Sequence, residues 1–219
     1  SLEDCRTLQS DVNRFYRCCI ENKLIVNDSK CKVISLSRKT HNILKYNYVV
    51  NDKPLVRVSE IKDLGVMIDH TLSFVPHINH ICTQAIKTSG FIKRNVSDFK
   101  DVNCLLSLYY VLVRCRLEYA SVGWSPFYFV HVQSLERIQI KYCKYLYFVE
   151  SGAYPPKHFD RRVLYNRFSM ESLEDRRKLS CNIFIFKLSH HMINCIFEFQ
   201  CTSIEQSSFF SIFNSPFPY

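Results

Sequence analysis

Apolar residues recur at intervals of four, three and four along the first twenty positions of the chain. They are Leu8, Val12, Phe15 and Cys19. This spacing places them on one face of a helix that has 3.6 residues per turn. Ser1, followed three residues later by Asp4, forms a capping-box pattern at the start of that helix. The sequence therefore predicts that the chain opens with an amphipathic helix.

Short β-rich runs replace the helical pattern after Asn27-Asp28. The runs cover residues 31–36, 46–50, 55–58 and 64–68. Residues 51–54, Asn-Asp-Lys-Pro, have turn chemistry and separate two of these runs, which predicts a hairpin. Residues 1–70 are thus expected to form a helix followed by a small antiparallel sheet.

The period of the apolar positions becomes helical after Pro76. Helices are predicted over residues 78–90, 102–113, 131–149 and 172–188. The last of these opens with Ser172 and Asp175, a second capping-box pattern. The resulting fold class is α+β, with a small sheet that leads into helices.

The positive charge of the chain is unevenly distributed. The formal net charge is +9, and residues 71–196 carry 17 basic and 9 acidic side chains. A basic surface indicates a polyanionic partner such as nucleic acid. The alternative is an ordinary solvated surface that has no such partner.

Composition argues against several classes of protein. The 4 glycines form no phosphate-binding loop. The 11 cysteines contain no Cys-x-x-Cys pair, which favours reduced thiols and a cytoplasmic or nuclear location. No secretory signal pattern is present, and Lys187 interrupts the longest apolar stretch, 181–199, so we expect neither secretion nor a membrane span.

Two groups of histidine and cysteine suggest zinc at first sight. They are His77, His80 and Cys82, and His190, His191 and Cys195. Structural zinc needs four ligands, usually in two closely spaced pairs, and neither group has a second pair nearby. We therefore expect no metal in this chain, and we expect His77 to pack or cap at the start of its helix.

Six short blocks occur in order over residues 1–190. They are Leu8-Gln9-Ser10-Asp11 with 22–24 and 27–31; Lys62-Asp63-Leu64-Gly65-Val66; Leu72-Ser73-Phe74 with His77-Ile78; Val113-Arg114 with Leu117-Glu118-Tyr119-Ala120-Ser121 and Trp124-Ser125-Pro126; Leu135-Glu136-Arg137-Ile138-Gln139; and Ser172-Leu173-Glu174 with Arg176-Arg177. Together they resemble the C-terminal half of reverse transcriptases of non-LTR retrotransposons of the LINE type, in particular the Jockey-like ones.

The resemblance implies a division of the chain into four parts. Residues 1–70 would be the last part of the polymerase palm, and 71–150 the thumb. Residues 151–196 would be a helical extension, and we expect 197–219 to be a poorly ordered tail. The implied function is to contact a primer–template made of RNA, RNA–DNA hybrid or DNA.

The resemblance also implies what this chain lacks. The polymerase site of the family is a Tyr-x-Asp-Asp turn whose carboxylates, with a third from the palm, hold two Mg²⁺ ions. This sequence contains no Asp-Asp pair. We therefore expect the chain alone not to polymerise DNA and to hold no cofactor, with the rest of the palm and an endonuclease supplied by a full-length parent.

Two alternatives to the polymerase part stay open at this stage. The first is a decayed or stand-alone remnant that binds nucleic acid without catalysis. The second is a helical interaction protein unrelated to nucleic acid, whose binding would not respond to salt.

The strongest candidate for nucleic-acid contact is a basic row. Arg137, Lys141 and Lys144 follow a helical spacing, and such a row could track a phosphate backbone. Tyr142 and Tyr145 could stack on bases. Their spacing nevertheless puts them on the apolar face, so we predict that they pack in the core.

The remaining candidates come from the resemblance. Leu64-Gly65 resembles the hairpin that grips the primer, although Gly65 could equally mark a strand bulge. Lys62 and Arg114 belong to the blocks and are assigned to the same interface. Lys30 could be a proton donor near an incoming nucleotide, but a surface lysine beside a strand is the simpler interpretation.

Overall fold

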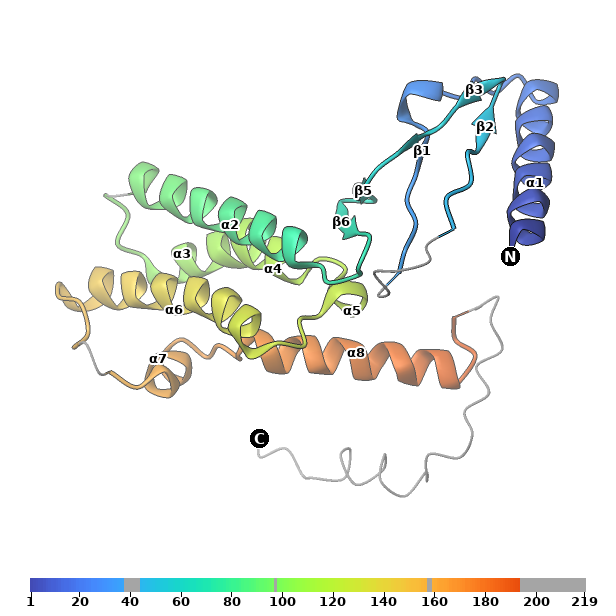
Figure 1. The fold of residues 1–219 in the computed structure, drawn as a ribbon. Helices are drawn as coiled ribbons and strands as arrows, with labels where there is room; N and C mark the ends of the chain where they lie inside the picture. Colours follow the sequence, from blue (N-terminus) through green and yellow to red (C-terminus); the bar gives the residue numbers. More distant parts are fainter. Residues whose placement is uncertain (38–43, 97, 157–158, 194–219) are drawn as a thin grey trace.

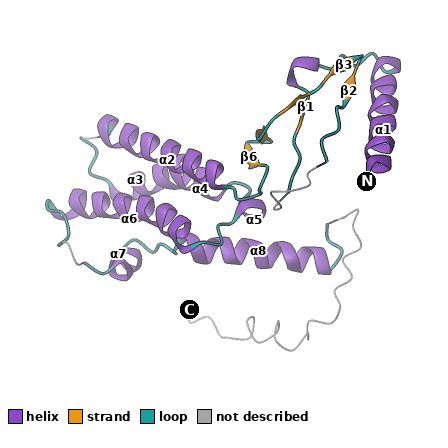
Figure 2. Ribbon diagram, in the orientation of Figure 1, coloured by secondary structure: helices purple, strands orange, loops and turns teal. Residues whose placement is uncertain are grey.

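The computed structural model describes residues 1–37, 44–96, 98–156 and 159–193. Within them the fold is α+β, as predicted, with a strand-rich N-terminal region that leads into a helical body (Figures 1 and 2). The predicted tail, 197–219, lies outside the described residues. No described helix has both the length and the apolar character needed to cross a bilayer.

The predicted N-terminal helix is α1, Leu2–Glu21, and it carries the predicted capping box. The Ser1 hydroxyl accepts a hydrogen bond from the backbone N–H of Asp4 at 3.3 Å. The apolar face is only weakly covered, since the exposed fraction of Phe15 is 67%. A reciprocal pair of hydrogen bonds between the Gln9 amide and the backbone of Val49, at 2.8 and 2.9 Å, attaches α1 to the strands.

The strands form three separate two-stranded sheets. The strands are β1 (Lys32–Val33), β2 (Val49–Val50), β3 (Lys53–Pro54), β4 (Val56–Arg57), β5 (Glu60–Asp63) and β6 (Val66–Asp69). The pairs β2–β3 and β5–β6 are antiparallel, and β1 pairs with β4 in parallel. The predicted hairpin between runs 46–50 and 55–58 is wrong in its second strand, because β2 pairs with β3 inside the predicted turn 51–54 while β4 of run 55–58 pairs with β1. No predicted run covers β5. The predicted runs of four to six residues are therefore too long, because pairing extends over only two to four residues of each strand. A 3₁₀ helix, Asp28–Lys30, precedes β1.

Two tight turns connect the antiparallel pairs. Asn51 and Asp52 have φ values of 50° and 56°, and Leu64 and Gly65 have values of 43° and 88°. Two consecutive positive φ values are typical of the two-residue hairpin turn that matches strand twist. The predicted run 64–68 is therefore wrong at its start, because left-handed backbone at Leu64 and Gly65 ends one strand before Val66 begins the next.

The helical body follows. Its elements are α2 (Val75–Asn95), α3 (Val102–Leu108), a π-helix (Tyr109–Arg114), α4 (Cys115–Glu118), α5 (Ser121–Trp124), α6 (Phe129–Ser151), α7 (Arg161–Arg167) and α8 (Leu173–Ser189). All four predicted helices are present. The predicted end of α2 near Gly90 is wrong: burial of Ile92, whose exposed fraction is 2%, favours continuation of the helix through the glycine to Asn95.

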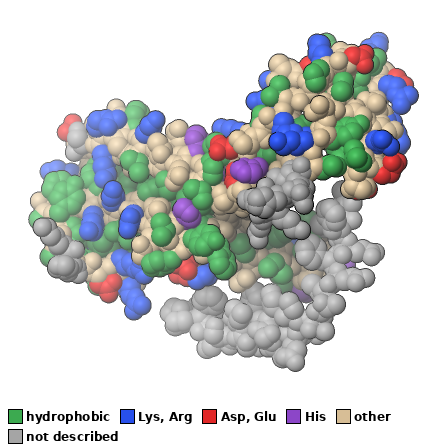
Figure 3. Space-filling view, viewed as in Figure 1, with side chains coloured by type: hydrophobic (Ala, Val, Ile, Leu, Met, Phe, Trp, Pro, Cys, Tyr) green, Lys and Arg blue, Asp and Glu red, His purple; other side chains and the backbone are tan. Residues whose placement is uncertain are grey.

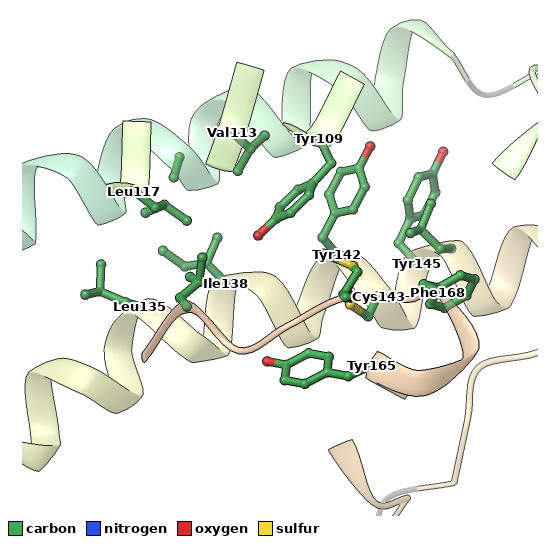
Figure 4. Close-up of a cluster of buried hydrophobic side chains, with 14 of the residues drawn as sticks. Tyr109, Val113, Leu117, Leu135, Ile138, Tyr142, Cys143, Tyr145, Tyr165 and Phe168 are labelled. Carbon is green, nitrogen blue, oxygen red and sulfur yellow. Dashed lines mark hydrogen bonds between the residues drawn. The ribbon is translucent and has the colours of Figure 1, made fainter. Parts of the chain in front are cut away.

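One core holds the helical body together, and all of its buried members lie between Ile78 and Leu173. Figure 4 shows aromatic and aliphatic side chains from the π-helix, α4, α6 and α7 meeting in it. Tyr142 and Tyr145 belong to this core, as predicted, with exposed fractions of 1% and 7%. Trp124, at 1%, also packs inside. The core fixes α6 by its buried face and leaves the opposite face to solvent.

Candidate nucleic-acid interface

The predicted basic row lies on the outer face of α6. Arg137 and Lys141 are exposed and Lys144 is half-buried. Their spacing of four and three residues keeps them on one face of the helix. The row continues toward the helix start through Gln133, whose side-chain carbonyl accepts a hydrogen bond from the Arg137 guanidinium at 3.5 Å.

A fourth cation from a neighbouring helix joins this row. Lys93 of α2 places its Nζ 4.8 Å from the centroid of the Tyr145 ring. Burial lowers the pKa of Lys93, and the nearby charge of Lys141 lowers it further. Figure 3 shows Lys and Arg side chains gathered over α2 and α6 on this face. We refer to Lys93, Arg137, Lys141 and Lys144 as the cationic row.

No carboxylate neutralises the cationic row within the described residues. None of its four members takes part in an ion pair there, whereas other basic side chains of the body do. Helix α6 itself contributes two acids. Glu136 is buried, and Glu150 pairs with Arg167 at 2.8 Å. Like charges held close together repel one another, so this face favours an anion between them.

The Leu64-Gly65 turn forms the tip of the β5–β6 hairpin and rests on a tyrosine from the helical body. The Tyr119 hydroxyl donates to the Leu64 carbonyl at 2.9 Å. A Cβ at Gly65 would lie 3.3 Å from Cε1 of Tyr119. Glycine at this position therefore allows both the positive φ and the close approach of the tyrosine ring. The glycine thus occupies a hairpin turn rather than a strand bulge. The Leu64 side chain is 84% exposed.

Arg114, Lys62 and Lys30 come from elements other than the two helices that carry the cationic row. Arg114 stacks on the Tyr110 ring at 3.8 Å and approaches Glu118 at 3.9 Å, so its charge is partly neutralised. Lys62 is exposed on β5, and Lys30 is exposed at the end of the 3₁₀ helix before β1. Figure 1 places β1 and α1 away from α2 and α6. The structure therefore gathers only part of the predicted residues.

An aspartate that sequence reasoning missed organises the junction between hairpin and helices. The Asp69 carboxylate accepts hydrogen bonds from the Thr71 hydroxyl and from the backbone N–H of Ser73 and of Phe74, the last at 2.7 Å. Partial burial works against ionisation, but these hydrogen bonds prevail and lower the pKa of Asp69 to about 2. This role of Asp69 could have been predicted from the sequence, because an aspartate is followed by Thr and Ser just before the start of a helix.

His77 lies at the same junction, as predicted for a packing residue. Its exposed fraction is 1%, and its ring meets Trp124 edge-on at 5.0 Å. Nδ1 accepts the backbone N–H of Met67 in β6 at 3.3 Å. Burial lowers the pKa of His77, which favours the neutral ring that this hydrogen bond requires. His77 thus ties the start of α2 to the hairpin.

A buried polar network joins α6 to α8. The carboxylate of Glu136 accepts from the Tyr165 hydroxyl at 2.7 Å and from the Glu174 backbone N–H at 2.8 Å. Gln139 accepts from the Tyr109 hydroxyl at 2.9 Å and donates to the Glu171 carbonyl at 2.8 Å. These bonds fix the rotation of α6 about its axis, and therefore the direction of the cationic row.

The described residues contain few side chains that are close enough together to bind a metal ion. Among the described residues, no three side chains of His, Cys, Asp or Glu come together in a way that could hold a metal. These residues do not fit the two-magnesium site of a polymerase, which needs convergent carboxylates. Cys195 of the second zinc candidate lies outside the described residues.

No protein family, curated protein or solved structure matches this chain.

Proposed function

We propose that this chain is the palm end and thumb of an RNA-directed DNA polymerase from a non-LTR retrotransposon, and that it holds the primer–template. The observation that carries the proposal is the cationic row, a set of four cations from α2 and α6 with no acidic partner among the described residues. Such a row is typical of proteins that follow a phosphate backbone.

The geometry of the row suits a nucleic-acid strand. From Arg137 to Lys144 the helix rises by about 10 Å, at roughly 1.5 Å per residue. A strand of duplex advances about 3.4 Å per phosphate along its axis, so the row faces roughly three consecutive phosphates. The buried network around Glu136 and Gln139 holds the row in this direction.

Contacts join five of the six sequence blocks that carry the resemblance to the polymerase family. Tyr119 of the fourth block bonds to Leu64 of the second, and Glu136 of the fifth bonds to Glu174 of the last. His77 and Trp124 join the third and fourth. Blocks distant in sequence therefore meet in one body, which is compatible with their belonging to a single domain.

The salt dependence of binding tests this proposal. Arg137→Ala, Lys141→Ala and Lys144→Ala, combined in one variant, should lower the slope of log K against log salt for an RNA–DNA hybrid by about 2 to 3, since each phosphate contact contributes about 0.7 to 0.9. The matched control replaces Arg6, Arg14 and Arg17 of α1 with Ala, which removes the same charge. Equal slopes for the two variants, or binding that ignores salt, would contradict the proposal.

A second candidate is a stand-alone nucleic-acid-binding remnant without catalysis, which the cationic row, unpaired with any acid among the described residues, would serve equally well. The coding sequence upstream of Ser1 separates the two. A continuous frame with a Tyr-x-Asp-Asp turn supports the polymerase part, and a start or stop codon near Ser1 supports the remnant.

A further inference from the structure

Exposed aromatic rings stand at the beginning of α6, ahead of the cationic row. The exposed fractions of Phe127, Tyr128 and Phe129 are 96%, 71% and 69%. The rings of Phe127 and Tyr128 meet at 6.0 Å with an interplanar angle of 88°, so the pair presents ring faces in two directions. Clustered aromatic surface of this kind is unusual on a protein unless it serves contact with another molecule.

A second aromatic platform stands at the other end of the same helix. The Phe148 ring stacks on Tyr154 with centroids 4.6 Å apart and an interplanar angle of 14°. Phe148 is 38% exposed and Tyr154 59% exposed. Stacking holds the Tyr154 ring in place while much of it stays open to solvent. A ring held in this way binds a further planar group at little additional cost in conformational entropy.

The two platforms belong to the face of α6 that carries the cationic row. Phe129, Gln133, Arg137, Lys141, Lys144 and Phe148 follow one another at spacings of four, four, four, three and four residues. At about 100° per residue, these six positions fall within about 120° of the helix circumference, with Phe129 at one edge and the three cations and Phe148 within about 60° of one another. The order along this face is therefore ring, polar side chain, three cations and ring.

We propose that this face of α6 binds single-stranded nucleic acid, with phosphates on the cationic row and unpaired bases stacked on the rings at its two ends. The inference rests on the proposed role of the cationic row and adds the unpaired bases. A duplex keeps its bases stacked on one another, so only a single strand can offer a base face to each ring. The combination of a basic track with flanking aromatics is typical of single-strand binding.

Charge complementarity selects nucleic acid over an apolar protein partner. The cations lie between the rings, and the two acids of α6 are either buried, as Glu136 is, or paired, as Glu150 is. An apolar partner would have to desolvate three positive charges to reach both aromatic ends. A polyanion with planar bases satisfies both kinds of surface.

The length of the ligand follows from the helix. Phe129 and Phe148 are separated by about 28 Å at roughly 1.5 Å per residue. A stacked strand that advances about 3.4 Å per nucleotide spans this distance with about eight nucleotides. A ten-nucleotide RNA labelled with 2-aminopurine near each end is therefore a suitable probe, because stacking on an aromatic ring quenches its emission.

The test compares the unpaired RNA with an RNA–DNA hybrid of the same sequence on the full chain. In the double variant Phe129→Ala with Tyr154→Ala, we expect affinity for the single strand to fall about tenfold or more relative to affinity for the hybrid, in line with the stacking typically lost per ring. We also expect the quenching seen with the unaltered chain to disappear. The matched control is Phe15→Ala, an exposed ring of α1 whose exposed fraction is 67%. It should change neither quantity.

Each outcome has a distinct meaning. Selective loss of single-strand affinity and quenching supports the inference. If the aromatic variant binds both ligands normally while loss of the three α6 cations weakens both, the inference is overturned and the proposed function stands. If the unaltered chain binds neither ligand, both fail. Circular dichroism and emission from the buried Trp124 check that each variant is folded.

Discussion

The N-terminal region, residues 1–69, and the helical body contain helices with similar apolar spacing, but they bury those apolar residues to different extents. In α1 the apolar spacing is regular, yet Leu8 remains 51% exposed. In α6 a similar spacing places Leu135 and Leu146 at 0%. Within the described residues up to Asp69, only Cys19, Val50 and Asp69 itself are buried. An apolar face therefore predicts that a helix forms, but not that the helix is buried. Burial depends on a second surface of matching shape.

This difference has an energetic consequence. Burial of apolar area and close packing supply most of the stability of a fold, at about 25 cal/mol per Å² removed from water. The helical body buries twenty apolar side chains in one cluster, and none of them comes from the N-terminal region. We therefore expect the helical body to dominate the free energy of unfolding, and the following experiments test that expectation.

The largest effect is expected from a core truncation in α6. Leu146→Ala should lower the free energy of unfolding by about 4 kcal/mol, because it opens a cavity among residues that cannot fully collapse. Leu8→Ala in α1 is the matched control and should cost less than about 1 kcal/mol, since half of that side chain is already in water. Thermal and urea unfolding measure both. Equal losses would mean that α1 is packed as tightly as α6.

The next effect concerns the buried network between α6 and α8. Glu136→Gln removes the charge that accepts from Tyr165 and Glu174, and it takes a negative charge away from the buried guanidinium of Arg177. We expect a loss of about 2 kcal/mol, the usual cost of disturbing buried polar partners. Glu150→Gln, at the exposed pair with Arg167, should cost far less, because water screens an exposed ion pair. A reversed order in urea unfolding would refute the structural role of Glu136.

A smaller, pH-dependent effect is expected at the junction of the two regions. The pKa of Asp69 is lowered from its ordinary 3.8 to about 2, so the unfolded chain binds this proton more readily than the folded chain does. Its contribution to stability, about 1 to 2 kcal/mol, is complete above about pH 5 and is lost as pH falls through 2. The difference in unfolding free energy between the unaltered chain and Asp69→Asn should shrink over that window. A difference that stays constant from pH 6 to 2 would rule this out.

The smallest effect is expected at the hairpin tip. Tyr119→Phe removes the hydrogen bond to the Leu64 carbonyl, and should cost about 0.5 to 1 kcal/mol. The free energy of global unfolding should change little. The rate of amide hydrogen exchange should rise in β5 and β6, while the amides of α6 stay protected. Tyr128→Phe, at an exposed ring outside this contact, is the control. Faster exchange throughout α6 would show that the hairpin and body unfold together.

Sequence reasoning was most accurate where a pattern is local. The capping boxes at Ser1 and Ser172 depend on residues within one turn, and helices begin directly after both. The apolar stripe predicts α6 but places its start at residue 131, whereas the helix begins at Phe129. It was least accurate where a distant residue decides. The end of α2 depends on burial of Ile92, and the turn at Leu64-Gly65 depends partly on Tyr119, 55 positions further along the chain.

Local patterns were enough to predict the α+β class, the position of the main helices and the spacing that places Arg137, Lys141 and Lys144 on one face, because these properties follow from the fixed periods of helix and strand. That Lys93 joins them depends on the packing of α2 against α6, and no local pattern predicts it. The packing of the core also places the side of α6 that carries the cations and the terminal rings toward solvent. Such neighbours come from different helices, and their meeting depends on how the core packs rather than on any local period.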